Sequence, residues 1–228
     1  MVLIIVILAV AFLLVVLPQL WIHRIMDRHA AERADIAGTG GEFARHALDQ
    51  LKLYGVKVEQ TEMGSHYDPI SRTVRLEPRF MSGRSLSAIV VAAHEVGHAM
   101  QHAMNLPMFE RRIRVAEKAH IFSMVAAGFL FAAPLLMLIG KTPMALVINV
   151  VGIVGSILLS LMTQIVTLPV EFDASFNRAL PLLQKGRYIK DEDMPAARSL
   201  LRAAAYTYVA GLLRTLIQIP GLGRIPRI

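Results

Sequence analysis

The chain has 228 residues, of which 55% are hydrophobic and 18% are charged, too apolar a balance for an ordinary soluble domain of this length. It contains no cysteine, which excludes disulfide frameworks and thiolate metal sites, so any metal must be held by imidazole and carboxylate groups. The net charge of +7 fits basic residues gathered on the cytoplasmic side of a membrane, and without a recognised nucleic-acid motif we expect no nucleic-acid partner.

Residues 1–22 predict a transmembrane anchor. From residue 2 to residue 22 the only polar side chain is that of Gln19, which satisfies the need for about 20 apolar residues in a spanning helix. Basic residues follow this run rather than precede it, and no small-residue cleavage site stands at its end. We therefore interpret it as an uncleaved anchor and not as a secretory signal, with the polar block of residues 23–118 on the cytoplasmic side.

This polar block predicts a small α+β domain. Apolar residues at helical spacing predict an amphipathic helix over residues 40–55. Alternating segments over residues 56–59 and 73–76, separated by turn signals, predict two or three short strands. A further apolar helix follows, and either Ser85 or Ser87 is placed to cap it.

Residues 119–168 predict a transmembrane hairpin. Between Ile121 and Val170 the only charged side chain is that of Lys141, in a turn-like segment between two apolar runs of about 20 to 25 residues. Because such a hairpin begins and ends on the same side of the membrane, residues 169–228 are expected on the side of the polar block.

The C-terminal segment holds a further apolar stretch. Too few residues separate Arg202 from Arg214 for a span between them, so we favour a helix that lies in the membrane interface or packs on the domain. The alternative is a fourth span in which both arginine side chains snorkel to the surface. The fold expected overall is a multi-pass α-helical membrane protein with a small α+β domain, mainly α in total.

The motif that carries chemistry is "AHEVGHAMQH" at residues 93–102. On a helix, His94 and His98 lie on one face a turn apart, so they can present two imidazole nitrogens to one ion. Glu95 is placed to take a proton from a zinc-bound water and to hand it to the leaving amine. This is the HExxH arrangement of zinc metalloproteases. The alternative is that this motif occurs by chance on a solvated helix. It is disfavoured because the helix is apolar, and burying two histidines and a glutamate in it without partners would cost free energy.

A catalytic zinc site needs three protein ligands and an open fourth position. His102 lies one turn beyond His98, but three ligands along one straight helix would span about 12 Å, too far for a single ion. No glycine turn of the HExxHxxGxxH kind brings it back, so we expect His102 near the site or on the surface. Glu171 and Asp173 lie just past the second apolar run of the hairpin, at the start of a predicted helix, where they also fit a favourable charge pair at a helix N-terminus. The residues alone leave five candidates for the third ligand: His66, His120, Glu110, Glu171 and Asp173.

Five separated motifs together resemble the YugP-like family of bacterial membrane-bound neutral zinc metallopeptidases, in the same order and over nearly the whole chain. The motifs are "HYDP" at 66–69, "VRLEP" at 74–78, "SLSAIVVAAHEVGHAMQH" at 85–102, "LPVEFDAS" at 168–175 and "LRAAAYTYVA" at 201–210. The resemblance implies a zincin-like domain that faces the cytoplasm. It also implies that His94 and His98 are zinc ligands, that Glu95 is the base, and that Glu171 is the third ligand.

The layout is also similar to that of the HtpX and CAAX-protease families. In those families an acid follows the ligating glutamate by four residues, whereas here Asp173 follows Glu171 by two. An acid near a ligand glutamate is suited to orient a ligating imidazole, and this is the role we weigh for Asp173.

Zincins bind the substrate backbone along an edge strand beside the motif helix, and "HYDPISRTVRL" at 66–76 is placed for that role. The oxyanion of the tetrahedral intermediate needs a hydrogen-bond donor, either His66 or Tyr67 and either Tyr206 or Tyr208. From these we select His66 and Tyr208 as catalytic residues. The alternative for each tyrosine is a packed aromatic side chain with a satisfied hydroxyl.

The sequence therefore predicts a zinc metalloendopeptidase of the bacterial inner membrane, multi-pass, which cuts peptides or membrane proteins at the cytoplasmic face. Zinc is the expected cofactor, and the bilayer and the substrate are the expected partners. One alternative is a non-proteolytic membrane scaffold or chaperone-like factor with a structural zinc, against which the intact Glu95 argues because such a site needs no base. Another is an intramembrane protease, which the position of the motif before the hairpin disfavours.

Overall fold

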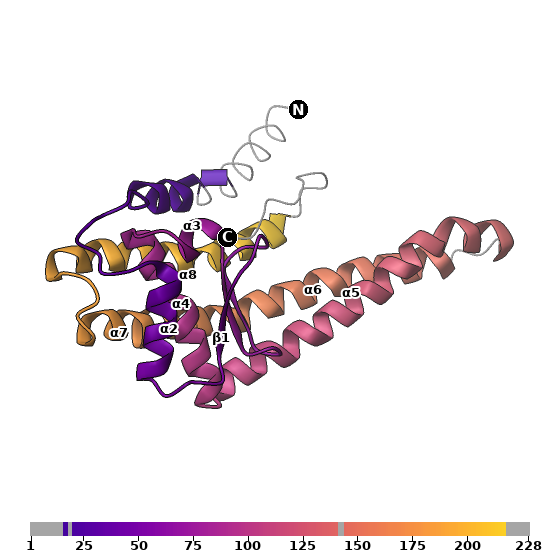
Figure 1. The fold of residues 1–228 in the computed structure, drawn as a ribbon. Helices are drawn as coiled ribbons and strands as arrows, with labels where there is room; N and C mark the ends of the chain where they lie inside the picture. Colours follow the sequence, from indigo (N-terminus) through magenta and orange to yellow (C-terminus); the bar gives the residue numbers. More distant parts are fainter. Residues whose placement is uncertain (1–15, 18–19, 141–143, 218–228) are drawn as a thin grey trace, which may run out of the picture.

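The structure, a computed structural model, describes residues 16–17, 20–140 and 144–217 of the chain (Figure 1). It is mainly helical with one small sheet, which confirms the expected mainly α class with a small α+β unit. A helix covers residues 20–28. The other helices are α2 (Gly40–Gln50), α3 (Pro78–Met81), α4 (Leu86–Ala103), α5 (Pro107–Gly140), α6 (Met144–Phe172), the π-helix η1 (Asp173–Ala179), α7 (Leu180–Lys185), the 3-10 helix η2 (Asp191–Asp193) and α8 (Met194–Ile217).

One helical stretch among the described residues, Val150–Lys185, is long and apolar enough to cross a membrane, as judged by length and composition. Most of the predicted anchor, at residues 1–15 and 18–19, lies outside the described residues. The multi-pass arrangement and the division into residues 1–22, 23–118, 119–168 and 169–228 therefore stay predictions.

The sheet has the order β1-β3-β2, with β1 parallel and β2 antiparallel to β3. The strands predicted at 56–59 and 73–76 are confirmed to within one residue. The segment at 66–76, expected to form a single edge strand, forms two strands because the chain turns back on itself. Its first half is the edge strand beside α4, and its second half is the central strand of the sheet. The strands are β1 (Lys57–Gln60), β2 (His66–Asp68) and β3 (Thr73–Leu76).

Helix α4 is the centre of the domain, and it is buried along almost its whole length because α2, η1 and α8 pack around it. Ser85 is the cap, since its hydroxyl accepts a hydrogen bond from the Ala88 amide at 3.2 Å. The Ser87 hydroxyl instead donates to the Met26 carbonyl at 2.7 Å. This bond ties the helix over residues 20–28 to the start of α4, and Ile22 of that helix is fully buried.

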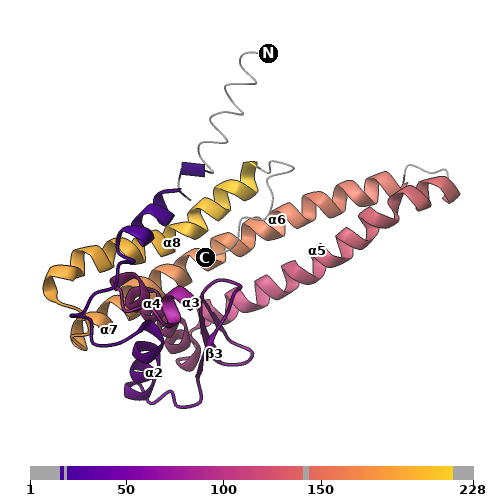
Figure 2. The same ribbon diagram turned by 45° about the horizontal axis from the view of Figure 1, so that its top comes forward.

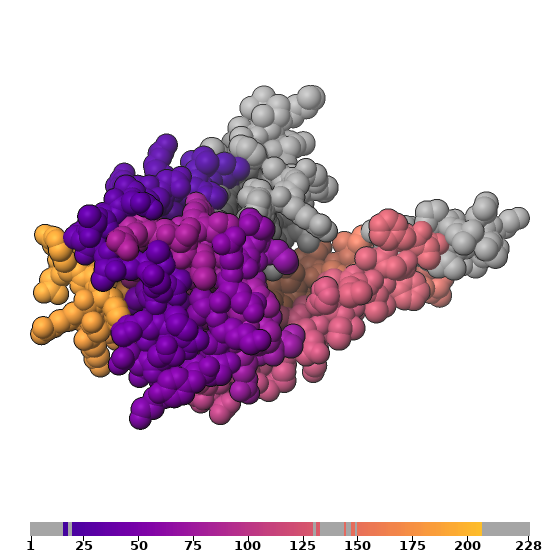
Figure 3. Space-filling model, viewed as in Figure 1, coloured from indigo at the N-terminus to yellow at the C-terminus, as the bar shows by residue number. Residues whose placement is uncertain are grey.

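Helices α5 and α6 form a long antiparallel hairpin that projects from the domain (Figures 1 and 2). The space-filling view shows the hairpin leaving the packed body of the molecule (Figure 3). Large apolar side chains are exposed along both helices, as expected of a surface that a membrane covers. Examples are Phe129, Phe131, Val151 and Ile165.

Helix α8 returns beside α6 and packs its first half on the domain (Figure 2). Leu200, Leu201 and Ala205 of this half are fully buried. The side chains beyond residue 206 are outside the described part, so the choice between an interfacial helix and a fourth span stays open to experiment.

The end of α6 is irregular where it meets α4. Pro169 lies inside α6 and has no amide hydrogen, and about one turn later, at Asp173, the helix continues as the wider π-helix η1. On the facing side, a Cβ added at Gly97 would lie 2.7 Å from the Ala174 carbonyl oxygen of η1. The absence of a side chain at Gly97 thus allows the close crossing that brings the end of α6 over α4.

We expect Gly97→Ala to lower the free energy of unfolding by about 1–3 kcal/mol, because the added methyl group overlaps backbone that has little room to shift. Gly55→Ala is the matched control, since nothing lies within 4 Å of a Cβ there. Thermal unfolding of the two purified variants measures the difference. Equal stability would show that the crossing tolerates a side chain.

Candidate metal centre

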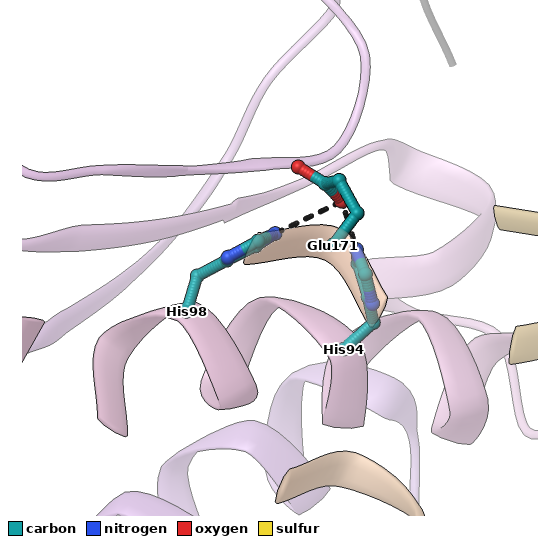
Figure 4. A group of neighbouring side chains, drawn as sticks. All are labelled: His94, His98 and Glu171. Carbon is teal, nitrogen blue, oxygen red and sulfur yellow. Dashed lines mark hydrogen bonds and ion pairs between the residues drawn. The ribbon is translucent and has the colours of Figure 1, made fainter. Parts of the chain in front are cut away.

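Three buried side chains meet where the end of α6 crosses α4 (Figure 4). The Nε2 atom of His94 lies 3.1 Å from Oε2 of Glu171, and the Nε2 atom of His98 lies 3.3 Å from the same oxygen. One ligand atom of each residue lies within 4.8 Å of the others. The two histidines come from successive turns of α4, and the glutamate comes from the last turn of α6.

The orientation of the His98 ring follows from its partner Gln101. The amide nitrogen of Gln101 donates to the Val170 carbonyl at 2.8 Å and to Oδ2 of Asp173 at 2.9 Å. Its amide oxygen is therefore the acceptor of the 2.9 Å contact with Nδ1 of His98. Because Nδ1 carries the hydrogen, Nε2 of the neutral ring presents its lone pair toward Glu171.

The His94 ring is held in the same way by Ser175. The hydroxyl of Ser175 has an acceptor in the Leu201 carbonyl at 3.4 Å, so it accepts from Nδ1 of His94 at 3.1 Å. The Nε2 atom of the neutral His94 ring then also presents a lone pair. While both rings are neutral, two imidazole lone pairs and a carboxylate oxygen converge with no hydrogen between them. A cation relieves this arrangement, and so does a proton on Nε2 of His94 that is donated to Glu171.

The donor set fits zinc, which binds imidazole nitrogen and carboxylate oxygen and has an open fourth position in catalytic sites. The other oxygen of the Glu171 carboxylate faces a different cation. Oε1 of Glu171 is a buried oxygen with no hydrogen-bond partner among the described residues, and the Arg112 guanidinium lies 3.3 Å away as an ion-pair partner. Burial acts to lower the pKa of His94, but the hydrogen bond and charge of Glu171 outweigh it and raise the pKa. The carboxylate thus favours positive charge beside it.

Sequence reasoning missed three residues of this site, namely Gln101, Ser175 and Arg112. Gln101 lies three residues after His98 and Ser175 four residues after Glu171, so helical periodicity alone would have placed both on the right faces. Asp173, weighed as an orienting acid, contacts the Gln101 amide rather than an imidazole. It is itself held by Asn177 and Arg178, so it acts on His98 through one intervening side chain.

A cavity opens beside His94 and His98, and Glu95 lines it with them. His66 of the edge strand β2 lines the same cavity, with its Nδ1 donating to the Gly64 carbonyl at 2.8 Å. In the neutral ring Nε2 is then an acceptor, so His66 can donate to an oxyanion only in its doubly protonated form. Ser65, Tyr67 and Arg112 also line the cavity. The rest of the wall is apolar and comes from the helix over 20–28, from α4 and from α8: Ile22, Met26, Val90, Val91, Leu200, Leu201 and Ala204.

Tyr67 and His102 pair with each other, with the Tyr67 hydroxyl 2.9 Å from Nδ1 of His102. Burial raises the pKa of Tyr67 to about 12, so its hydroxyl keeps its proton near neutral pH and can donate to the ring. The His102 ring also packs on Phe109, with 5.5 Å between the ring centroids. His102 is half-buried and lies apart from the cluster of three ligands.

The other candidates lie away from the three converging side chains. Glu110 and His120 are on α5, where Glu110 pairs loosely with Arg114 at 4.0 Å. Tyr206 is 39% exposed and its ring packs near Trp21 and Phe172. Tyr208 lies in α8 at a position whose side chain is outside the described part of the structure.

A buried pair of HExxH histidines that converges on a glutamate from a later helix, and that lines a cavity with the motif glutamate, defines the zinc metallopeptidase class. The chain belongs to the family described as "Putative neutral zinc metallopeptidase", whose profile matches residues 4–224. It is 38% identical over 197 residues to the "Putative membrane protease YugP" of Bacillus subtilis (strain 168), which covers 85% of this chain and 83% of that protein. No solved structure matches the chain. The family predicted from the five sequence motifs is confirmed.

We expect Glu171→Ala to weaken zinc binding by more than about 100-fold, because loss of a mere orienting partner already costs about 10–100-fold. His102→Ala is the matched control and should keep about one zinc per chain, since its ring contacts Tyr67 and not the cluster. Metal analysis after dialysis against a weak chelator measures both. Zinc loss confined to the His102 variant would show that the third ligand is misassigned.

Proposed function

We propose that the chain is a membrane-bound zinc-dependent endopeptidase that hydrolyses peptide bonds of peptides or membrane proteins at the cytoplasmic face. The observation that carries this proposal is that His94 and His98, which line a cavity together with Glu95, converge on the buried carboxylate of Glu171. A structural zinc site would fill its fourth position with protein and would need no base. This arrangement therefore favours catalysis over a scaffold or chaperone-like role.

His94, His98 and Glu171 are the residues that would hold zinc, with Ser175 and Gln101 fixing the orientation of the two imidazoles. When bound, zinc supplies a Lewis acid that lowers the pKa of a coordinated water and polarises the scissile carbonyl. Glu95 takes the proton from the attacking water and passes it to the nitrogen of the leaving amine. Its place in a largely apolar cavity keeps bulk water away from that transfer.

Substrate binding is assigned to the edge strand β2. This strand pairs with β3 on one side and lies beside α4, so an extended peptide can add to its other edge next to the candidate ligands. His66 lies on this strand and lines the cavity, and we assign it the stabilisation of the oxyanion in its protonated form. We assign the same task to Tyr208, on the sequence argument alone.

The location at a membrane is supported by the apolar surface of the hairpin and by the description of the Bacillus subtilis relative as a membrane protease. Glu171 lies at the domain end of α6, where the hairpin meets the packed body of the molecule (Figures 1 and 4). This position favours cleavage at the cytoplasmic surface over cleavage within the bilayer. The proposal of an inner-membrane protein with residues 23–118 in the cytoplasm rests on the basic residues that follow the predicted anchor.

Glu95→Gln tests the mechanism directly. We expect it to lower the rate of peptide cleavage by about 10²–10⁴-fold, because the amide cannot accept the proton of the attacking water. Zinc content should stay at that of the wild type, since Glu95 is not among the converging ligands. Fluorogenic peptide libraries and metal analysis of the same preparations measure the two quantities. Wild-type cleavage rates in the glutamine variant would refute the assigned base.

A reporter fusion tests the topology. Fusing a reporter after Gln60, at the end of β1, should yield the cytoplasmic signal, because the basic residues that follow the predicted anchor favour the cytoplasmic side. A fluorescent protein that matures only in the cytoplasm and a phosphatase active only in the periplasm provide opposite readouts for the same junction. Phosphatase activity at this position would reverse the proposed orientation.

A further inference from the structure

The carboxylate of Glu171 is fully buried and uses its two oxygens differently. Oε2 faces the Nε2 atoms of His94 and His98 at 3.1 and 3.3 Å. Oε1 faces the Arg112 guanidinium, whose NH1 lies 3.3 Å away, and it has no hydrogen-bond partner among the described residues. Among the described residues, the ion pair with Arg112 thus distinguishes Oε1 from Oε2.

A buried carboxylate can rotate about its last bond and exchange the two oxygens, unless one of them is held by a partner. The fixed charge of Arg112 favours the rotamer in which Oε1 faces the guanidinium, and this leaves Oε2 for the imidazoles. The guanidinium also offsets part of the cost of burying the carboxylate charge. Both effects act on the geometry of the site before any metal arrives.

The pair also joins the two ends of the hairpin. Arg112 lies in the second turn of α5, where the hairpin leaves the domain, and Glu171 lies in the last turn of α6, where it returns. Arg112 lines the cavity, whereas its neighbour Arg111 on the same helix is exposed to solvent. The contact therefore connects the start and the end of the hairpin at the candidate metal site.

We propose that Arg112 is a positioning residue that holds Glu171 in its ligating orientation and thereby couples the hairpin to the metal site. This proposal rests on the proposed zinc site. Two effects of Arg112 on a divalent cation have opposite signs. Repulsion between like charges would make the metal bind more tightly once the guanidinium is removed, whereas loss of positioning would make it bind more weakly. The direction of the change therefore decides which effect governs the site.

The experiment compares zinc affinity, by chelator competition, for full-length wild type, Arg112→Met, Arg112→Gln and Arg112→Lys in detergent or lipid nanodiscs. We expect zinc to bind about 10–100-fold more weakly to the two neutral variants. Arg112→Lys keeps the charge and should recover most of the affinity. Arg111→Met is the matched control on the same helix and should bind zinc as the wild type does. Having two neutral variants keeps the comparison possible if one of them does not fold.

A second readout separates positioning from general destabilisation. The absorption spectrum of bound Co²⁺ reports ligand number and geometry, and it should change in Arg112→Met and stay unchanged in Arg111→Met. Unchanged or tighter zinc binding in both neutral variants would overturn the role assigned to Arg112 and leave the zinc site standing. A wild-type chain that binds no zinc would instead overturn the proposed function, and this inference with it.

Discussion

The arrangement of the molecule depends on one electrostatic constraint, the meeting of three electron-pair donors in a buried space. Two imidazole nitrogens each lie within about a hydrogen-bond length of one carboxylate oxygen. Hydrogen-bond partners on the far side of each ring leave both of these nitrogens without a hydrogen as long as the rings are neutral. Such an arrangement is unfavourable without positive charge. A site of this kind persists in a folded protein because the surrounding packing holds it and a cation repays the cost.

The packing that holds it is specific. Gly97 and Ala174 allow α4 and η1 to approach closely, and the helical irregularity after Pro169 sets the direction in which the end of α6 faces α4. The imidazoles are oriented by uncharged oxygens, and the ionised groups Asp173 and Arg178 are one step further out. The rings are therefore fixed by direct hydrogen bonds, while the field at the candidate ligands comes mainly from Glu171 and Arg112.

The hairpin separates the two parts of the site along the chain. His94 and Glu171 are 77 residues apart in sequence, and α5 and α6 lie between them. The site can form only when the hairpin has folded back and returned α6 to the domain. The site therefore lies where the hairpin meets the domain.

The sequence by itself determined the features that depend on local periodicity. The spacing of His94, Glu95 and His98 is set by helix geometry, and the hairpin and the strands follow from runs of apolar or alternating residues. Glu171 was singled out by the family resemblance, because the residues alone left several acids and histidines equivalent. The tertiary structure decided which ring nitrogens face the carboxylate, the division of "HYDPISRTVRL" into an edge and a central strand, and the parts taken by Gln101, Ser175 and Arg112. The reason is that these contacts join segments far apart in the chain, and no local pattern records which of them will meet.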